Sequence, residues 1–339
     1  LRGTADMYVG MSELHRERNE LTTATQYLLK SKEMGEHTGF PQYPYRWRVA
    51  MARIREAEGD LDGALDLLHE AERLYVSDFY PNVRPVSALK TRVWVAQGRL
   101  SEALNWAHEQ GLSIHDDLTY LREFEHITLA RVLLARYQHD HLDHALLEAV
   151  GLLERLLEAA EAGAQGAPRM GRVIEILLLQ ALAHQLQDDL PAALVPLQRA
   201  LTLAEPEGYV RIFVDAGEAM RLLIVASRSW IAEQLGSAQN KKLTLYADKL
   251  LVGFGHQPAK VDNALADESP KIQNLVEPLS ERELDVLRLL RTDLSGPEMA
   301  RQLIVSLNTL HTHTKNIYSK LGVNNRRAAV RRAEELDLF

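Results

Sequence analysis

The chain has 339 residues, of which 46% are hydrophobic and 25% charged, with a formal net charge of −8 and no cysteine. This composition is ordinary for a soluble protein, and the lack of cysteine excludes disulfides and thiolate metal sites. No apolar run reaches the roughly 18 residues that span a bilayer, and no signal peptide opens the chain, so we expect a cytoplasmic protein. Because the chain begins at Leu1 without Met, we also expect it to be part of a longer protein.

A short cassette recurs through the first two thirds of the chain: a polar or turn residue, Leu, two further residues, then Ala. Its Ala positions are spaced 40, 39, 42 and 48 residues apart, at Ala24, Ala64, Ala103, Ala145 and Ala193. An apolar-periodic segment precedes each of the last four cassettes, over residues 45–58, 85–97, 120–137 and 171–187. The pattern predicts an all-α array of stacked helical hairpins that resembles tetratricopeptide repeats.

Such arrays present a concave groove, and three segments carry aromatic and charged residues that suit a sugar, a peptide or a small anion. The alternative is that the aromatics are core between repeats and the charges a solvated face. The candidate groove residues are Tyr45, Arg46, Arg48, Tyr80, Arg84, Arg122 and Glu125.

The repeats fade after Glu205. Residues 207–217 are expected to form a loop and a capping turn, followed by helices near 218–235 and 240–252. Residues 253–278 are rich in Gly, Pro, Asp, Asn and Ser and lack periodicity, which indicates a flexible linker. The expected domains are therefore a repeat domain at 1–252, a linker at 253–278 and a C-terminal domain at 279–339.

The C-terminal segment is a basic island on an acidic chain. Residues 1–278 hold 29 Lys and Arg against 39 Asp and Glu, a net of −10, whereas residues 279–339 hold 10 against 8, a net of +2. Between Met299 and Arg332 there are seven Lys and Arg and no Asp or Glu. Such an island attracts a phosphate backbone.

Four short helices are expected within residues 279–339. Ser280 and Glu283 form a capping box at the start of the first, Ser295 and Ser306 cap the second and third, and Gly322 ends the third. The residues expected to face the core are Leu284, Leu287, Leu290, Met299, Ala300, Leu303, Leu310, Ile317, Tyr318, Leu321, Ala329, Val330, Ala333 and Leu336. A short helix, a tight turn and a longer helix with a polar face make a helix-turn-helix.

This segment closely resembles the LuxR-type DNA-binding domain, through L-S-x-R-E, V-S-x-N-T-L and H-T-K-N-I-Y-x-K-L-G-V. The resemblance implies that the helix at 307–321 enters the major groove of double-stranded DNA. It places His311, Thr312 and Lys315 at base-reading positions, although His311 replaces a frequent Lys. The positions that match contacts to the DNA backbone are Ser306, Asn308, Thr309, Lys320 and Arg326.

The array and this domain together resemble the large ATP-dependent LuxR regulators of the MalT-like group, on landmarks such as GDLDGALDLLHEAERLY and GYVRIFVDAG. That resemblance implies a nucleotide-binding domain before the repeats. No G-x-x-x-x-G-K-[ST] occurs in this chain, so ATP is expected only for an upstream module and no cofactor for this part.

No pattern in the chain indicates an enzyme. The three histidines His139, His141 and His144 have metal-ligand spacing, but a polar turn between helices is the preferred interpretation. We therefore expect a bacterial transcription regulator that binds DNA as a dimer or higher oligomer and has an effector-sensing repeat array. The alternative is a repeat scaffold whose main role is to bind a protein partner.

Overall fold

The computed structural model describes residues 3–76, 81–163, 168–233, 238–255, 281–292, 299, 302–303, 310, 314, 317, 323 and 326–335. Within these residues the secondary structure is helical, as expected for an all-α chain. The chain divides into two compact units, Leu1–Lys260 and Val261–Phe339, and each is described by itself.

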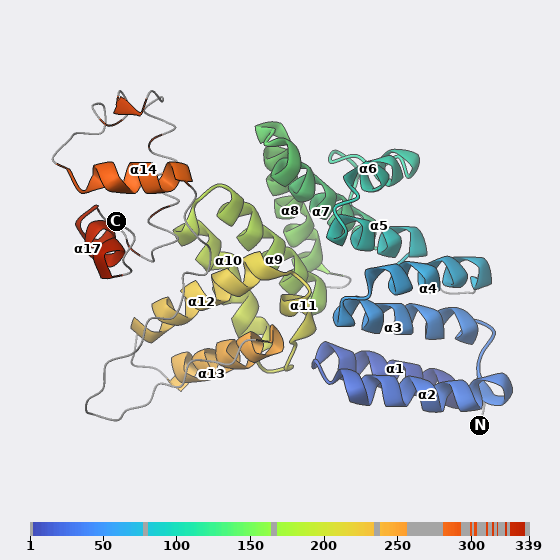
Figure 1. Cartoon of the computed structure of the whole chain (residues 1–339). Helices are drawn as coiled ribbons and strands as arrows, with labels where there is room; N and C mark the ends of the chain where they lie inside the picture. The colour runs from blue at the N-terminus through green and yellow to red at the C-terminus, as the bar shows by residue number, and fades with distance from the viewer. Residues whose placement is uncertain are drawn as a thin grey trace. The chain divides into compact units, whose positions relative to one another are not determined.

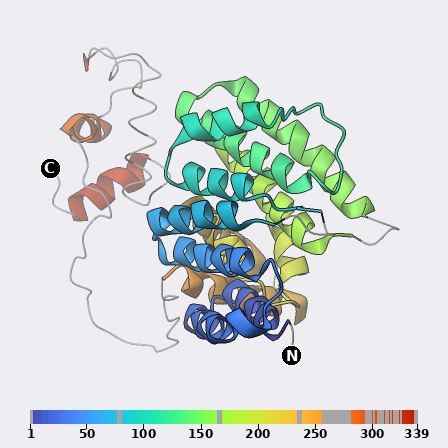
Figure 2. The same ribbon diagram turned by 90° about the vertical axis from the view of Figure 1, so that its right-hand side faces the viewer.

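The first unit begins with five helical hairpins stacked one on the next (Figure 1). The hairpins are α1 (Thr4–Glu17) with α2 (Leu21–Thr38), α3 (Tyr43–Glu58) with α4 (Leu61–Leu74), α5 (Val86–Ala96) with α6 (Leu100–Glu109), α7 (Glu123–Asp140) with α8 (Asp143–Ala162), and α9 (Met170–Leu186) with α10 (Leu190–Ala204). The view turned by 90° follows the stack from the blue pair α1 and α2 to the green pair α7 and α8 (Figure 2). The predicted repeat array is confirmed.

The recurring cassette marks the start of the second helix of every hairpin. All five cassette alanines have 0% exposed surface, since a small side chain there lets the neighbouring helix approach closely. Asp60 and Asp189 cap α4 and α10 by accepting hydrogen bonds from the backbone N–H of Gly63 and Ala192, each at 3.0 Å.

The turns within the hairpins need a left-handed residue. Gly59 and Gly98 supply it in the second and third hairpins, with φ of 84° and 72°. Asn19, His141 and Asp188 take the same region elsewhere, with φ of 64°, 53° and 58°. Asn, Asp and His tolerate this conformation better than other non-glycine residues, so the turn recurs without a recurring glycine.

Helix α9 lies at the centre of the first unit. Seven consecutive residues, 173–179, are buried, so this helix is covered on all sides rather than on one face. Glu175 is the one charged residue in that run. Among the first helices of the hairpins, α1 packs on α3, α5 on α7 and α7 on α9.

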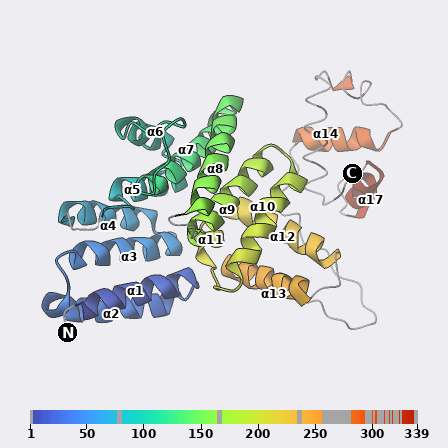
Figure 3. The ribbon, with the colours of Figure 1, turned by 180° about the vertical axis from the view of Figure 1, so that it is seen from behind.

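The end of the array returns to its beginning. The short helix α11 (Arg211–Val214) lies against α1, as the view from behind shows (Figure 3). The backbone N–H of Val210 donates to the carbonyl of Glu17 at 2.8 Å, and buried Arg16 donates to Asp215 at 2.5 Å. Residues about 200 positions apart therefore close the array on itself. The capping turn expected at 207–217 contains this helix.

Two further helices complete the first unit, α12 (Glu218–Glu233) and α13 (Ala238–Gly253). Fully buried Phe213 of α11 packs edge-on against Tyr246 of α13, with ring centroids 6.0 Å apart. The hydroxyl of Tyr246 donates to the carbonyl of Tyr209. The expected linker lies largely outside the described residues.

The second unit contains α14 (Glu281–Leu290) and α17 (Arg326–Glu335), which pack on each other. Its buried core consists of Val286, Leu287, Leu290, Met299, Leu310, Ile317, Ala329 and Ala333. Seven of these were expected to face the core, all but Val286, and Leu303 and Val330 pack against it while partly exposed. Leu284, Ala300, Tyr318, Leu321 and Leu336 were also expected to face the core, and their side chains lie outside the described residues.

Candidate functional site

The candidate groove residues on α3 each have a partner within the array. Tyr45 packs edge-on against Tyr75, with ring centroids 5.2 Å apart, and burial raises the pKa of its hydroxyl to about 12. Arg48 donates to Glu70 at 2.6 Å, and Arg46 lies 3.6 Å from Asp6. These contacts join α3 to its neighbours.

The remaining candidates have other surroundings. Arg122 donates to Glu125 at 3.2 Å and to the carbonyl of Gln110 at 2.9 Å. The exposed Arg84 lies 5.9 Å from the ring centroid of Phe124, and Tyr80 is outside the described residues. The described candidates therefore occupy three local settings, and their role in binding an effector stays a prediction.

A cluster of which the sequence analysis singled out only Arg84 lies across α5, α7 and α9 and the residues that precede α5 and α9. We call it the arginine cluster, and it comprises Arg84, Arg92, Arg131, Arg169, Arg172, Glu123 and Glu175. Glu175 accepts hydrogen bonds from Arg92 at 2.7 Å and from Arg131 and Arg172 at 3.0 Å each. Arg169 pairs with Glu123.

Burial and charge act against each other in this cluster. Burial alone would raise the pKa of Glu175, but the three guanidinium groups hold that pKa well below its ordinary range. Burial lowers the pKa of Arg92 to about 9, because the attraction of Glu175 does not fully offset desolvation and the nearby Arg131 and Arg172. One feature of the sequence indicates this cluster: the charged residue Glu175 lies inside the apolar run VIEILLL.

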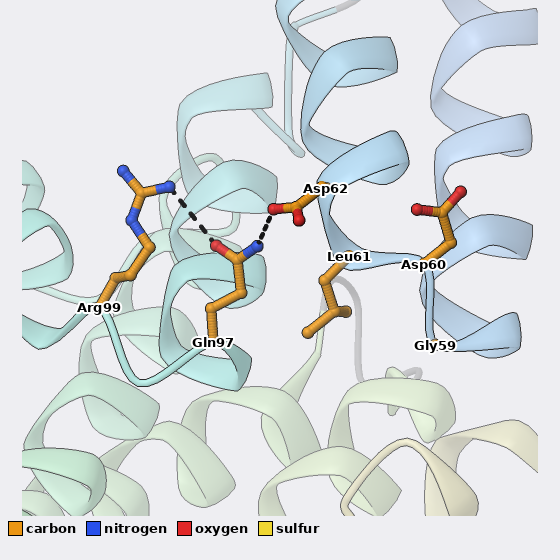
Figure 4. A pocket seen from close by; sticks show the side chains of 6 residues that line it. All are labelled: Gly59, Asp60, Leu61, Asp62, Gln97 and Arg99. Atoms are coloured by element: carbon orange, nitrogen blue, oxygen red, sulfur yellow. Dashed lines mark hydrogen bonds between the residues drawn. The ribbon is translucent and has the colours of Figure 1, made fainter.

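A shallow pocket of about 420 Å³ lies elsewhere, at the turns that precede α4 and α6 (Figure 4). Gly59, Asp60, Leu61, Asp62, Gln97 and Arg99 line it. The Gln97 amide donates to Asp62 at 2.8 Å and accepts from Arg99 at 3.5 Å. Because these polar groups bond one another, the pocket is explained by the packing of consecutive hairpin turns.

The DNA-contacting positions expected in the second unit lie outside the described residues, with the exception of Arg326. Its Nε donates to the carbonyl of Leu290 at 2.8 Å, and its Nη2 donates to the carbonyls of Leu289 and Thr292. The last carbonyls of a helix have no partner within the helix. Arg326 thus ties the C-terminal end of α14 to α17, and the phosphate contact expected of it stays a prediction.

We expect Arg326→Ala to destabilise the second unit by about 1–3 kcal/mol, because the carbonyls at the C-terminal end of α14 lose a charged donor. Hydrogen exchange measured on the full chain would report this as faster exchange at the backbone amides of α14 and α17. Arg331→Ala, at an exposed position of the same helix, is the matched control. Unchanged protection of α14 in the Arg326 variant would refute the anchoring role.

The histidine group lies where the preferred interpretation placed it, at the turn between α7 and α8. His139 contacts Asp140 at 2.6 Å, and His141 takes the left-handed conformation at the C-cap of α7. Within the described ranges no group of His, Cys, Asp and Glu is arranged to hold a metal ion. None of the described helices is long and apolar enough to cross a membrane.

Comparison with known families and proteins assigns both units. Residues 1–229 match the MalT-like TPR region, and residues 277–333 match the bacterial regulatory proteins of the luxR family. The HTH-type transcriptional regulators MalT of Klebsiella pneumoniae subsp. pneumoniae and of Serratia proteamaculans are 27% and 28% identical over 306 and 312 residues. Each alignment covers 87% of this chain and 32% of the relative, so the chain spans about a third of the length of these curated relatives.

A tetratricopeptide-like array joined to a luxR-family helix-turn-helix domain defines a repeat-containing member of the DNA-binding regulators. The first unit, with its five hairpins, accounts for the longer match. The chain belongs to the MalT-like TPR region family and carries a luxR-family domain.

Proposed function

We propose that this chain is the sensing and DNA-binding part of a bacterial transcription regulator, acting in the cytoplasm. The luxR-family match at residues 277–333 carries this proposal, since it coincides with the second unit and with the basic stretch from Met299 to Arg332. The relatives named as transcriptional regulators align over both units. The proposed domain boundaries are 1–252, 253–278 and 279–339.

The proposed reading face follows from helical periodicity. Leu310 and Ile317 are buried and stand seven residues apart, which is two turns of a helix. In such a helix, positions 311, 312 and 315 fall on the side away from these two residues. Lys315 can donate to guanine O6 and N7, and the methyl group of Thr312 can contact a thymine methyl.

Substituting two lysines of the proposed interface should have distinguishable effects. DNA fragments are first selected from a random pool by binding to the wild-type chain. Lys315→Ala is then expected to weaken binding to the selected fragment by about tenfold to a hundredfold, because a base contact is lost, with little effect on unselected DNA. Lys320→Ala is expected to weaken binding to both DNAs alike, as loss of a phosphate contact does.

Lys30→Ala, an exposed position on α2, is the control for both variants. Equal affinity of the Lys315 variant and the wild type for the selected fragment would overturn the reading face. Arg326 is unsuited to this test, because its substitution would also loosen α14.

The repeat array is proposed to sense an effector and to control oligomerisation. A single helix-turn-helix domain makes few phosphate contacts, so useful affinity requires dimers or higher oligomers on repeated half-sites. A nucleotide-binding module upstream of the array, with ATP as its ligand, belongs to the same proposal. A ligand screen by thermal shift on the whole chain tests the sensing role, since an effector raises the unfolding temperature of the array.

A further inference from the structure

The arginine cluster holds more positive charge than its carboxylates neutralise. Four arginines pair with the two glutamates, and a fifth, Arg84, lies over Phe124 beside them, whereas residues 1–278 as a whole carry a net charge of −10. Both oxygens of Glu175 are already shared among three guanidinium groups. Glu123 is likewise shared, between Arg169 and, at 3.7 Å, Arg172. Positive charge is therefore concentrated within an otherwise acidic part of the chain, and concentrated positive charge attracts anions.

Specific N–H groups of the cluster have no acceptor. Within the described part of the chain, Nη2 of Arg92 and Nε of Arg131 are buried without a hydrogen-bond partner. A buried donor left unsatisfied is costly, so buried donors in native proteins are nearly always hydrogen-bonded. No carboxylate among the described residues lies within ion-pair distance of Arg84.

The ring of Phe124 holds three of the guanidinium groups in place. The guanidinium carbons of Arg92, Arg172 and Arg84 lie 3.8, 4.9 and 5.9 Å from its centroid. A guanidinium stacked on an aromatic face keeps its N–H edge available, and that edge matches a carboxylate or phosphate with two parallel hydrogen bonds. The ring therefore preorganises donors at the cluster without neutralising them.

We propose that the arginine cluster binds a small anion through carboxylate or phosphate groups. This inference rests on the proposed function, because it names the chemical class of the effector that the array would sense. Arg84, exposed and lying over Phe124, makes the accessible contact, while Arg92 and Arg131 contribute the buried donors. The lowered pKa of Arg92 agrees with this, because its burial and the neighbouring Arg131 and Arg172 outweigh the attraction of Glu175.

Calorimetric titration of the full chain with inorganic phosphate, with citrate, and with sucrose as a neutral control tests the proposal. Saturable binding of phosphate, of citrate or of both is expected, with no binding of sucrose. Binding of one anion alone identifies the headgroup as phosphate or carboxylate. Arg84→Ala should weaken binding by about tenfold or more, since a charge-assisted pair is lost. Its unfolding temperature should stay close to that of the wild type, because Arg84 is exposed.

Arg199→Ala is the matched control, since Arg199 is an exposed arginine of α10 paired with Glu161, and its substitution should leave anion binding unchanged. Failure of both anions to bind, or equal affinity in the Arg84 variant, would overturn the proposal. DNA binding measured on the same preparation separates the two claims. Intact DNA binding without anion binding rejects the anion site alone, whereas absent DNA binding rejects the proposed function.

Discussion

Glu175→Ala is expected to lower the free energy of unfolding of the repeat unit by about 3–5 kcal/mol. Glu175 is 5% exposed and is the shared acceptor for Arg92, Arg131 and Arg172, so its removal leaves three guanidinium groups close together without their common counter-ion. These arginines come from α5, α7 and α9, so the loss affects the packing of three hairpins together. Urea denaturation followed by circular dichroism measures the effect.

Glu218→Ala is the appropriate control for the Glu175 variant. Glu218 also pairs with an arginine, Arg221, but its side chain is 63% exposed. Exposed ion pairs contribute about 0–1 kcal/mol, so this substitution should be nearly neutral. If the two variants unfolded at the same urea concentration, the arginine cluster would not be a stabilising element of the array.

Phe213→Ala is expected to lower the free energy of unfolding by about 3–5 kcal/mol, because it removes a fully buried aromatic side chain and leaves a cavity. Phe213 lies on α11, which joins the end of the array to α1 and packs on Tyr246 of α13. The closure should therefore loosen before the middle of the array does. Hydrogen exchange at the backbone amide of Val210, which donates to Glu17, reports on that closure directly.

Phe40→Ala provides a comparison with the same change in side-chain volume, because Phe40 is 50% exposed. This substitution should lower the free energy of unfolding by less than about 1 kcal/mol, because the exposed side chain of Phe40 buries little apolar surface. Unaltered protection of the Val210 amide in the Phe213 variant would show that α11 is held by other contacts.

The helical hairpins were predictable because their signal is local. A small residue is required wherever the second helix of a hairpin meets its neighbours, and the spacing of Ala24, Ala64, Ala103, Ala145 and Ala193 therefore recorded each hairpin. The turns within the hairpins could be recognised from the sequence only in part. Gly59 and Gly98 were recognisable, whereas Asn19 and Asp188 take the same left-handed conformation without a glycine.

The closure of the array and the arginine cluster were not predictable from periodicity. Both depend on contacts between residues distant in sequence, such as Arg16 with Asp215 and Arg92 with Glu175. Which helices come together is set by the small rotation between successive hairpins, and a repeat pattern does not specify that rotation. The candidate groove residues were chosen by composition. Tyr45, Arg46 and Arg48 contact neighbouring segments of the stack, whereas Arg122 pairs with Glu125 three residues along the chain.

The core of the second unit could be predicted from the sequence more fully than the contacts of the repeat array. Its motif specified the inward positions, and Met299, Leu310, Ile317, Ala329 and Ala333 are buried as expected. Arg326 shows the limit of such an assignment, because a positive charge at a helix start can bind a phosphate or the carbonyls of a neighbouring helix. The described contacts place its guanidinium on the end of α14.

The salt dependence of DNA binding tests the central claim most directly. Fluorescence anisotropy with a selected DNA fragment would be measured with the full chain between about 50 and 200 mM salt. A protein that neutralises DNA phosphates should give a logarithm of the association constant that falls linearly with the logarithm of salt concentration, with a slope of several negative units. Absence of binding at the lowest salt, or an affinity that does not change with salt, would contradict a DNA-binding regulator.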